Sequence, residues 1–437
     1  MWPYHPELLA VPVPRYTSYP TAAEFADGVG ADEQARALAG ASGDISLYLH
    51  VPFCERICWY CGCNTGAANR RQRVSSYLDA LQREVALVGQ ALPAGARVTT
   101  VAFGGGSPNA LTPIQFLGLV QDVIVRFGAL DADWSIELDP RSLTPDWLPT
   151  LKGVGVRRAS LGVQTFSPAL QDAIGRVQPD ADIARSVDLL RAAGVSSLNF
   201  DLMYGLPGQT MDDLEATLER TVALGADRVA LFGYAHVPHM LPRQQRIDAS
   251  RLPDAELRFA MAARGFDLLA AAGYQPVGFD HFALAADPLA RAAREGRLRR
   301  NFQGFTEDPA QTVIGLGATA ISCFPDLLVQ NEKNPGRYRM LLSQDRLTGA
   351  RGVVRTADDR RRGAVIEGLL CNGRARVDQA LWREAEPALA PFIAAGLCAL
   401  ANGQLVIAAD GLPYARSIAA RFDAYRPLTE RRFSSAI

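Results

Sequence analysis

Short runs of strand-forming residues alternate with longer amphipathic segments from residue 46 to residue 279, and this alternation constrains the fold most. Residues 46–52 (SLYLHVP) are rich in strand formers, and from residue 77 apolar side chains recur every three or four positions, as on one helix face. The same pattern predicts further strands at 98–103, 133–139, 157–163, 196–204, 227–235 and 275–279. It predicts helices at 112–127, 143–152, 180–193 and 253–272, and another that begins at the capping pair Thr210 and Asp213 and ends at Gly225.

Alternation of this kind predicts an α/β fold whose parallel sheet closes, or nearly closes, into a barrel with its function at the carboxyl ends of the strands. The rhythm fades beyond about residue 285. After residue 354 we expect helices at 356–370, 377–383 and 387–395 and a hairpin at residues 402–403, a pattern typical of a small appended domain of winged-helix type.

Four of the seven cysteines lie within ten residues, directly after the first predicted strand: Cys54, Cys58, Cys61 and Cys63. The first three are spaced i, i+4 and i+7. Three thiolates on one short loop can bind three irons of a four-iron, four-sulfur (4Fe-4S) cube and leave the fourth iron without a protein ligand. That open iron is where chemistry could occur.

Zinc and disulfides are the alternatives for clustered cysteines. Structural zinc sites usually pair two ligand knuckles, and no second Cys or His pair follows within several dozen residues. A disulfide framework fits less well, because the cysteines are sparse and odd in number. We interpret the three scattered cysteines as core or subsurface thiols: Cys323, Cys371 and Cys398.

Composition bounds the partners and the location. Basic and acidic residues nearly cancel, 45 against 46, so we expect no nucleic-acid partner. No apolar run is long enough to span a bilayer. Residues 1–15 contain four prolines and lack the order of a signal peptide, which favours a cytoplasmic protein.

Polar and glycine residues cluster where the predicted strands end. Gly104, Gly105 and Gly106 precede Ser107 and Pro108, and consecutive glycines let backbone amides approach a ligand, although a plain glycine turn is as consistent with this segment alone. Other strands end near or carry Glu137, Asp139, Gln164, Asp201 and the segment 234–236 (YAH). Carboxylates and amides on one face would suit the ribose hydroxyls and the amino group of a nucleoside-amino-acid cofactor.

Residues 54–61 (CERICWYC) carry a C-x3-C-x2-C signature, and with the glycine run they resemble the radical S-adenosylmethionine (SAM) superfamily. Further segments resemble one of its families, the oxygen-independent coproporphyrinogen III oxidases, from Arg15 to Ile437. These segments are 15–21 (RYTSYPT), 61–64 (CGCN), 199–210 (NFDLMYGLPGQT), 234–236, 278–282 (GFDHF), 300–304 (RNFQG) and 422–425 (FDAY). The cysteine motif is specific only to the superfamily, whereas the N-terminal segment, Cys63 and the C-terminal match point to the oxidases.

The resemblance implies a three-quarter parallel β/α barrel of radical SAM type over residues 45–284. An N-terminal extension over the active site (1–44) would precede it. A segment that completes the barrel and connects it onward (285–353) and a smaller, mostly helical C-terminal domain (354–437) would follow. It also implies an electron-donor protein such as flavodoxin or ferredoxin, and we expect a monomer.

The resemblance further implies a 4Fe-4S cluster bound by Cys54, Cys58 and Cys61, together with two SAM molecules. Matched contacts to the SAM on the open iron are Tyr48, Gly105, Glu137, Ala235 and Ile321. Those to the second SAM are Tyr60, Gly106, Ser107, Gln164, Arg176 and Asp201. Tyr60 stands where Phe is familiar and Ser107 where Thr is common, but each keeps the needed ring or hydroxyl.

The implied reaction converts two propionate side chains of coproporphyrinogen III to vinyl groups by a 5′-deoxyadenosyl radical mechanism, giving protoporphyrinogen IX in heme biosynthesis. Cys63 could serve a proton or hydrogen transfer or be a structural thiol, and Arg15 could clamp a propionate. The alternatives are a radical SAM methyltransferase or a heme-degrading enzyme on the same scaffold, or a heme-carrier relative without decarboxylase activity. Cys63 and the N-terminal segment favour the decarboxylase over the carrier.

Overall fold

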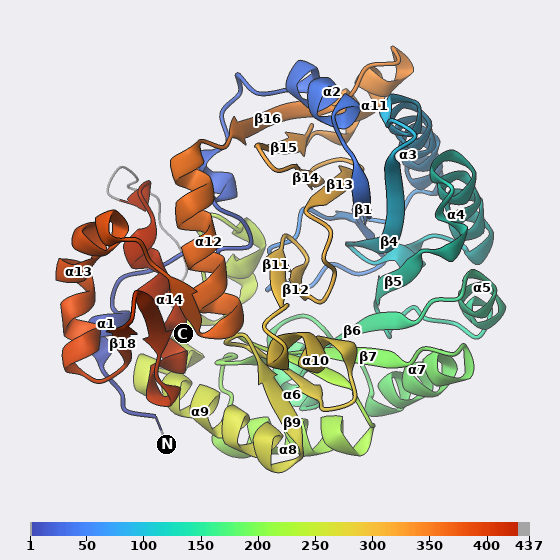
Figure 1. The fold of residues 1–437 in the computed structure, drawn as a ribbon. Helices are drawn as coiled ribbons and strands as arrows, with labels where there is room; N and C mark the ends of the chain where they lie inside the picture. Colours follow the sequence, from blue (N-terminus) through green and yellow to red (C-terminus); the bar gives the residue numbers. More distant parts are fainter. Residues whose placement is uncertain (1, 427–437) are drawn as a thin grey trace.

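A computed structural model describes residues 2–426, and a single curled sheet forms its frame (Figure 1). Within these residues the twelve strands of this sheet run in the order β16-β15-β14-β13-β1-β4-β5-β6-β7-β8-β10-β9, and the strands at its two ends are not bonded to each other. The run from β13 to β8 is parallel. Its strands are β13 (Thr312–Leu316), β1 (Gly43–Val51), β4 (Ala96–Gly105), β5 (Asp133–Leu138), β6 (Arg158–Gln164), β7 (Ser197–Tyr204) and β8 (Arg228–Gly233).

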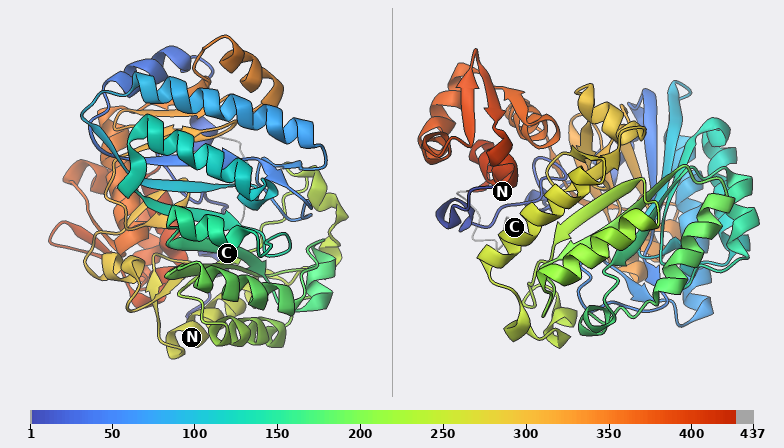
Figure 2. Two further views of the ribbon diagram at one scale, coloured as in Figure 1. Left: turned by 90° about the vertical axis from the view of Figure 1, so that its right-hand side faces the viewer. Right: turned by 90° about the horizontal axis from the view of Figure 1, so that it is seen from below.

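Helices cover the outer face of this curled sheet (Figures 1 and 2). They are α3 (Arg71–Ala91), α4 (Pro113–Phe127), α5 (Trp147–Val154), α7 (Asp180–Ala192), α8 (Met211–Ala223) and α9 (Ala255–Ala271). The capping pair predicted for α8 is confirmed, since the Thr210 side chain accepts from the Asp213 amide and the Asp213 side chain accepts in return. None of the helices in the described part of the chain is long and apolar enough to cross a membrane.

The core between sheet and helices is aromatic where β4 and β5 meet α4 and α5. The ring of Phe103 lies 4.8 Å from that of Phe116 and 6.1 Å from that of Trp134, measured between centroids. All three side chains are buried. This packing holds β4 and β5 in a fixed position against the covering helices. The carboxyl ends of the two strands are thereby fixed as well.

Both sides of the parallel run are extended by antiparallel strands. On one side lie β10 (His281–Leu284) and β9 (Tyr274–Val277), and on the other β14 (Ile321–Cys323), β15 (Leu327–Asn331) and β16 (Gly349–Val354). The strand predicted at 275–279 therefore exists but does not extend the parallel run. Only residues 278–280 join it to β10, which is too short for a crossover and long enough for a hairpin.

A buried carboxylate ties α3 to the β13 side of the sheet. Glu84 accepts hydrogen bonds from the Gly317 amide at 2.5 Å, from Asn331 Nδ2 at 2.9 Å and from the Tyr338 hydroxyl at 2.7 Å, and also from the Thr348 hydroxyl. Tyr338 belongs to α11 (Pro335–Ser343). Four donors on one carboxylate hold three elements together away from water.

The C-terminal elements lie to one side of the curled sheet (Figure 2). They are α12 (Ala357–Asn372), α13 (Gln379–Ala394), α14 (Ala415–Ala419) and a small sheet of β17 (Arg374–Arg376), β19 (Gln404–Ile407) and β18 (Cys398–Ala401). The hairpin predicted at residues 402–403 is confirmed. The break predicted between helices at 377–383 and 387–395 is wrong, because the one helix α13 covers most of both segments and continues through Pro387 and Pro391. Its continuous buried face, which includes Leu389 and Phe392, outweighs the roughly 3 kcal/mol that an interior proline costs.

The N-terminal segment contacts these C-terminal elements. It contains α1 (Pro6–Leu9) and α2 (Ala31–Ala39). The Tyr16 hydroxyl donates to Asp423 Oδ2 at 2.9 Å, and the His5 amide donates to the Tyr414 hydroxyl at 2.8 Å. The two ends of the described chain therefore hold each other. Residues 427–437 of the predicted C-terminal domain lie outside the described residues.

Candidate active site

The cysteine loop leaves β1 and is pinned at both ends. Its flanks form a two-stranded sheet of β2 (Phe53–Cys54) and β3 (Gly66–Ala67), in which the Gly66 amide donates to Pro52 O at 2.8 Å. All four cysteines of the loop are free thiols; Cys58 is buried, Cys54 and Cys61 are half-buried and Cys63 is exposed. The pinned flanks hold the cysteines at the carboxyl end of β1.

The glycine run packs against the start of this loop. The Gly106 amide donates to Val51 O at 2.9 Å and the Ser107 amide to Phe53 O at 2.7 Å. A Cβ at Gly105, whose φ is +105°, would lie 2.3 Å from the His50 ring, and one at Gly106 would lie 2.5 Å from Phe53 O. Glycine is required here because the end of β4 touches the cysteine loop itself.

A cavity of about 580 Å³ opens at the carboxyl ends of the parallel strands, where the sequence places it. Every predicted site residue except Tyr48 and Ile321 lines it: Arg15, Cys54, Cys58, Tyr60, Cys61, Cys63, Gly105, Gly106, Ser107, Glu137, Gln164, Arg176, Asp201 and Ala235. The Tyr48 hydroxyl lies 3.2 Å from His50 Nδ1. Ile321 lies on β14, where its backbone packs against Gly315. Neither of these two lines the cavity.

Two arginines and one aspartate surround the buried cysteine. Arg176 Nη1 and Arg141 Nη2 donate to Cys58 Sγ at 3.2 and 3.3 Å. Asp139 pairs with both, at 2.5 Å from Arg141 and 3.4 Å from Arg176. Although burial opposes it, the charge of Arg176 helps to hold the pKa of Asp139 below its usual range. The sulfur therefore faces two cations whose charge one carboxylate partly offsets.

The carboxyl groups of Glu137 and Asp201 both line the cavity. Burial raises the pKa of Glu137 to about 7. The Gly105 amide, which donates to Glu137 Oε2 at 3.1 Å, acts in the opposite direction and lowers this pKa. Burial also raises the pKa of Asp201, which accepts from Ser160 Oγ at 3.0 Å and Asn199 Nδ2 at 2.8 Å. Both carboxyls can accept hydrogen bonds from hydroxyl or amino groups in the cavity.

The remaining cysteines differ in acidity. A hydrogen bond from Cys63 lowers the pKa of Cys61 to about 6, and the same bond raises the pKa of Cys63. Burial raises the pKa of Cys54 to about 12. In the chain alone, Cys61 is thus the most acidic of these three thiols.

Arg141 and Gln244 line the cavity but were not predicted from the sequence. Arg141 follows Asp139 in a D-P-R tripeptide directly after β5, a signal that could have been found. Gln244 lies far along the chain, and its Nε2 donates to the carbonyls of Tyr60 and Ala235, both at 3.0 Å. It ties the cysteine loop to the end of β8. No motif in the sequence around Gln244 indicates this role.

The donors fit a cluster and a cofactor. Three thiols of one loop face the cavity, and Cys58 already receives two charged hydrogen bonds. Gln164 adopts a φ of +61°, and its buried Oε1 has no hydrogen-bond partner among the described residues, so an acceptor is available for a bound group. Within residues 2–426, no three His, Cys, Asp or Glu side chains converge closely enough to hold a single metal ion. A multi-iron cube spaces its ligands more widely than one ion does.

A match to a known protein family supports a cluster and a cofactor at this cavity. Residues 48–221 match the family model described as the radical SAM superfamily. The fold and the cysteine loop thus define a radical SAM protein.

Similar proteins of known name identify the family within the radical SAM superfamily. The chain is 41% identical to an oxygen-independent coproporphyrinogen III oxidase of Bradyrhizobium diazoefficiens, over 97% of each chain. It is 36% identical to the Escherichia coli protein of that name, over 94% of this chain and 93% of the relative. A solved structure of coproporphyrinogen III oxidase from E. coli superposes with a TM-score of 0.89 at 35% identity, covering 97% of this chain and 99% of that one. The chain belongs to the oxygen-independent coproporphyrinogen III oxidase family.

Proposed function

We propose that this enzyme oxidatively decarboxylates two propionate side chains of coproporphyrinogen III without oxygen. The products are vinyl groups, carbon dioxide and protoporphyrinogen IX, within heme biosynthesis. One observation carries the proposal: in a member of this family, the three cysteines of the C-x3-C-x2-C motif line a cavity of about 580 Å³. The enzyme is an oxidoreductase of the radical SAM class.

The cofactors are a 4Fe-4S cluster and SAM, for which we propose two bound molecules. Cys54, Cys58 and Cys61 would hold the cluster. When bound, the cluster and SAM would supply radical chemistry: hydrogen-atom removal from the β-carbon of a propionate, with SAM ending as methionine and 5′-deoxyadenosine, and the second electron passing to an acceptor as carbon dioxide leaves. The chain supplies positions, charge and exclusion of water.

Cavity residues divide between the two proposed SAM molecules. For the SAM on the open iron we propose Gly105, Glu137 and Ala235, which line the cavity. Tyr48 and Ile321 remain predictions, since they lie outside its lining. For the second SAM we propose the cavity-lining residues Tyr60, Gly106, Ser107, Gln164, Arg176 and Asp201.

Two further residues have proposed roles. Cys63 lines the cavity next to Cys61, which suits a proton or hydrogen transfer. Arg15 also lines the cavity, and its Nη2 donates to Gly233 O at 3.5 Å. A guanidinium at the cavity wall suits a propionate.

We also propose the type of barrel, the domain boundaries and the type of the C-terminal domain. The open, curled sheet supports a three-quarter barrel with domain boundaries near residues 44, 284 and 353. Two long helices with a three-stranded sheet support a winged-helix type for the C-terminal domain. Contacts of the N-terminal segment with Gly233 support an extension over the active site.

An electron donor must reach the cluster. Exposed arginines lie within and just after the cysteine loop: Arg56, Arg70, Arg71 and Arg73. We infer that an acidic one-electron carrier of the flavodoxin or ferredoxin kind docks there, because opposite charge steers such encounters. A monomeric state and a cytoplasmic location stay predictions.

Turnover tests the function. Anaerobically reconstituted enzyme, SAM, a reductant and coproporphyrinogen III are incubated, and the tetrapyrrole mass is measured. We expect the loss of two carbon dioxide units together with the hydrogens removed. Methyl transfer without decarboxylation, cleavage of heme, or tight heme binding without turnover would each contradict the proposal and indicate a related activity instead.

A further inference from the structure

Arg141 contacts the cysteine loop at two atoms. Its Nη2 donates to Cys58 Sγ at 3.3 Å and to the backbone oxygen of Arg56 at 3.2 Å. The Arg141 side chain is 7% exposed and lines the active-site cavity, but it is not among the residues proposed above for either SAM. A guanidinium shielded from water in this way interacts with a neighbouring charge more strongly than one at the surface.

The position of Arg141 is fixed by Asp139. Arg141 donates to Asp139 Oδ1 from its amide and from its Nε, both at 3.0 Å. The backbone of Asp139 is in turn held by Asn109, whose Oδ1 accepts from the Asp139 amide at 3.1 Å and whose Nδ2 donates to the Asp139 carbonyl at 2.9 Å. Asn109 is buried and lies in η2 (Pro108–Ala110), directly after the glycine run. The guanidinium is therefore held in a defined orientation toward the sulfur.

Two guanidiniums donate to Cys58 Sγ and share one carboxylate. Arg176 Nη1 donates at 3.2 Å, and Arg141 and Arg176 both pair with Asp139. Hydrogen bonds to the ligand sulfurs and the local charge are among the factors that set the potential of an iron–sulfur cluster. A cluster that takes one electron from its donor gains one unit of negative charge, which a nearby cation stabilises. An arginine at this sulfur therefore favours the reduced state.

We propose that Arg141 is a positioning residue that raises the reduction potential of the cluster through its hydrogen bond to Cys58, while Asp139 lowers that potential. Arg176 makes a similar bond but is also proposed to contact the second SAM, so the redox role can be measured by itself at Arg141. This inference rests on the proposed function, in which Cys58 is a cluster ligand. It assigns the D-P-R tripeptide after β5 to the control of electron entry.

A redox titration followed by electron paramagnetic resonance tests the proposal. Cluster-loaded wild type and Arg141→Met are reduced stepwise with dithionite and mediators, without SAM or tetrapyrrole. The midpoint potential of the variant should be more negative by about 59 mV, which is a tenfold loss in the equilibrium constant of a one-electron reduction. Asp139→Asn removes the opposing charge and should move the midpoint in the positive direction. An unchanged midpoint in Arg141→Met, or shifts of the same sign in the two variants, would overturn the proposal.

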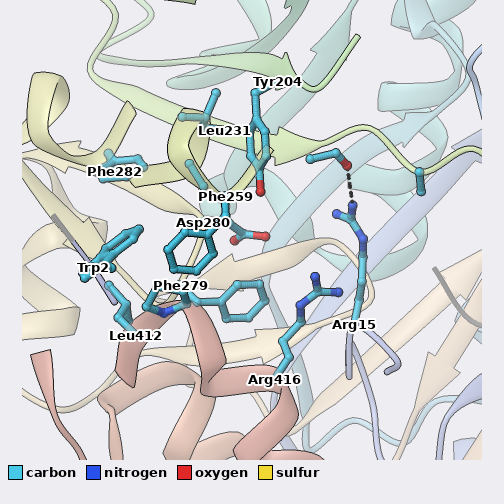
Figure 3. A pocket seen from close by; sticks show the side chains of 14 residues that line it. Trp2, Arg15, Tyr204, Leu231, Phe259, Phe279, Asp280, Phe282, Leu412 and Arg416 are labelled. Carbon is cyan, nitrogen blue, oxygen red and sulfur yellow. Dashed lines mark hydrogen bonds between the residues drawn. The ribbon is translucent and has the colours of Figure 1, made fainter. Parts of the chain in front are cut away.

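Arg15→Met is the matched control, because it removes the same charge from the same cavity. Arg15 lines the active-site cavity, but its Nη2 donates to Gly233 O at 3.5 Å (Figure 3), and its guanidinium lies 5.1 Å from the centroid of the Phe232 ring. The midpoint of this variant should shift by less than half as much as that of Arg141→Met. Equal shifts would mean that any positive charge in the cavity acts alike, and would overturn the role of the bond to Cys58.

Arg141→Lys separates the effect of charge from that of cluster assembly. Lysine keeps the positive charge, so this variant should recover part of the wild-type midpoint, and iron and sulfide analysis checks the cluster in each sample. If Arg141→Met does not hold the cluster, Arg141→Lys and Asp139→Asn decide, and the midpoint of Asp139→Asn must still lie above that of wild type. Loss of the cluster in both Arg141 variants would assign the residue to cluster assembly and overturn the redox role.

The titration contains no tetrapyrrole, so its result is independent of turnover. A wild type that decarboxylates coproporphyrinogen III, with the same midpoint in Arg141→Met, would overturn the redox role of Arg141 and leave the proposed function intact. The expected midpoint shifts, together with a wild type that does not turn over the tetrapyrrole, would overturn the function and leave the role of Arg141.

Discussion

Arg176 Nη1 donates a hydrogen bond to Cys58 Sγ at 3.2 Å, across 118 residues of sequence. Arg141 donates to the same sulfur, and Asp139 pairs with both arginines. Arg176 also donates from Nε to the Gly162 carbonyl at 3.1 Å, which anchors it to β6. The proposed cluster ligand is therefore oriented from the sheet, since Arg141 follows the end of β5 and Arg176 is hydrogen-bonded to β6.

Replacing Arg176 by Met should destabilise the fold. Removal of one partner of a buried ion pair leaves the other charge incompletely paired and costs about 3–5 kcal/mol. Urea denaturation measures the change. Arg185→Met, which breaks an exposed pair with Asp182, is the matched control and should cost less than about 1 kcal/mol. Equal losses in the two variants would show that the network around Cys58 contributes nothing special.

Glu84→Gln should also destabilise the chain, although the change is isosteric. Four donors face the Glu84 carboxylate, and an amide would turn an NH2 group toward at least one of them. Leaving a buried donor unsatisfied costs about 1–3 kcal/mol. The exposed Glu219→Gln variant should unfold at the urea concentration of wild type. A Glu84→Gln variant as stable as wild type would contradict the role of this carboxyl group as the acceptor of four hydrogen bonds.

Glu137 should make stability depend on pH. Burial raises its pKa from 4.5 to about 7, so the folded chain holds a proton that the unfolded chain has already released. The free energy of unfolding should therefore fall as the pH rises from 4.5 to about 7, by on the order of 3 kcal/mol, and show no further change from this group above that. Glu137→Gln should remove this contribution in urea titrations across the window. Identical slopes for variant and wild type would refute it.

Tyr16 and Asp423 should be energetically coupled. Their hydrogen bond of 2.9 Å joins the N-terminal segment to the C-terminal elements. A double-mutant cycle of Tyr16→Phe and Asp423→Asn should give a coupling energy of about 0.5–3 kcal/mol. Additive effects would mean that the two ends of the described chain are not held by this pair.

Local patterns predicted the elements well because helix and strand periodicity is read within one element. The helix predicted at 112–127 is Pro113–Phe127, and the strand predicted at 196–204 is Ser197–Tyr204. The cysteine loop fell at a carboxyl strand end for the same reason, since a β-α alternation fixes strand direction. Where a short link replaced a helix, at residues 278–280, the parallel prediction failed.

Contacts between distant segments could not be predicted in this way. Arg141 and Arg176 meet at Cys58 only because β5 and β6 are neighbours in the folded sheet. Ile321, assigned to the site by resemblance, stays a prediction; it lies on β14, which pairs antiparallel with β13, and it is not among the residues that line the cavity. Pro387 and Pro391 suggested a helix break that tertiary packing overrides.

Iron and sulfide analysis of anaerobically reconstituted protein tests the central claim most directly, with electron paramagnetic resonance of the reduced sample. Wild type should contain one 4Fe-4S cluster per chain, and adding SAM should change the resonance because one iron is open to it. Cys58→Ala should lose the cluster, whereas Cys371→Ala, at a buried thiol outside the cavity, should keep it. A wild-type chain without the cluster, or with one whose resonance SAM leaves unchanged, would contradict the account.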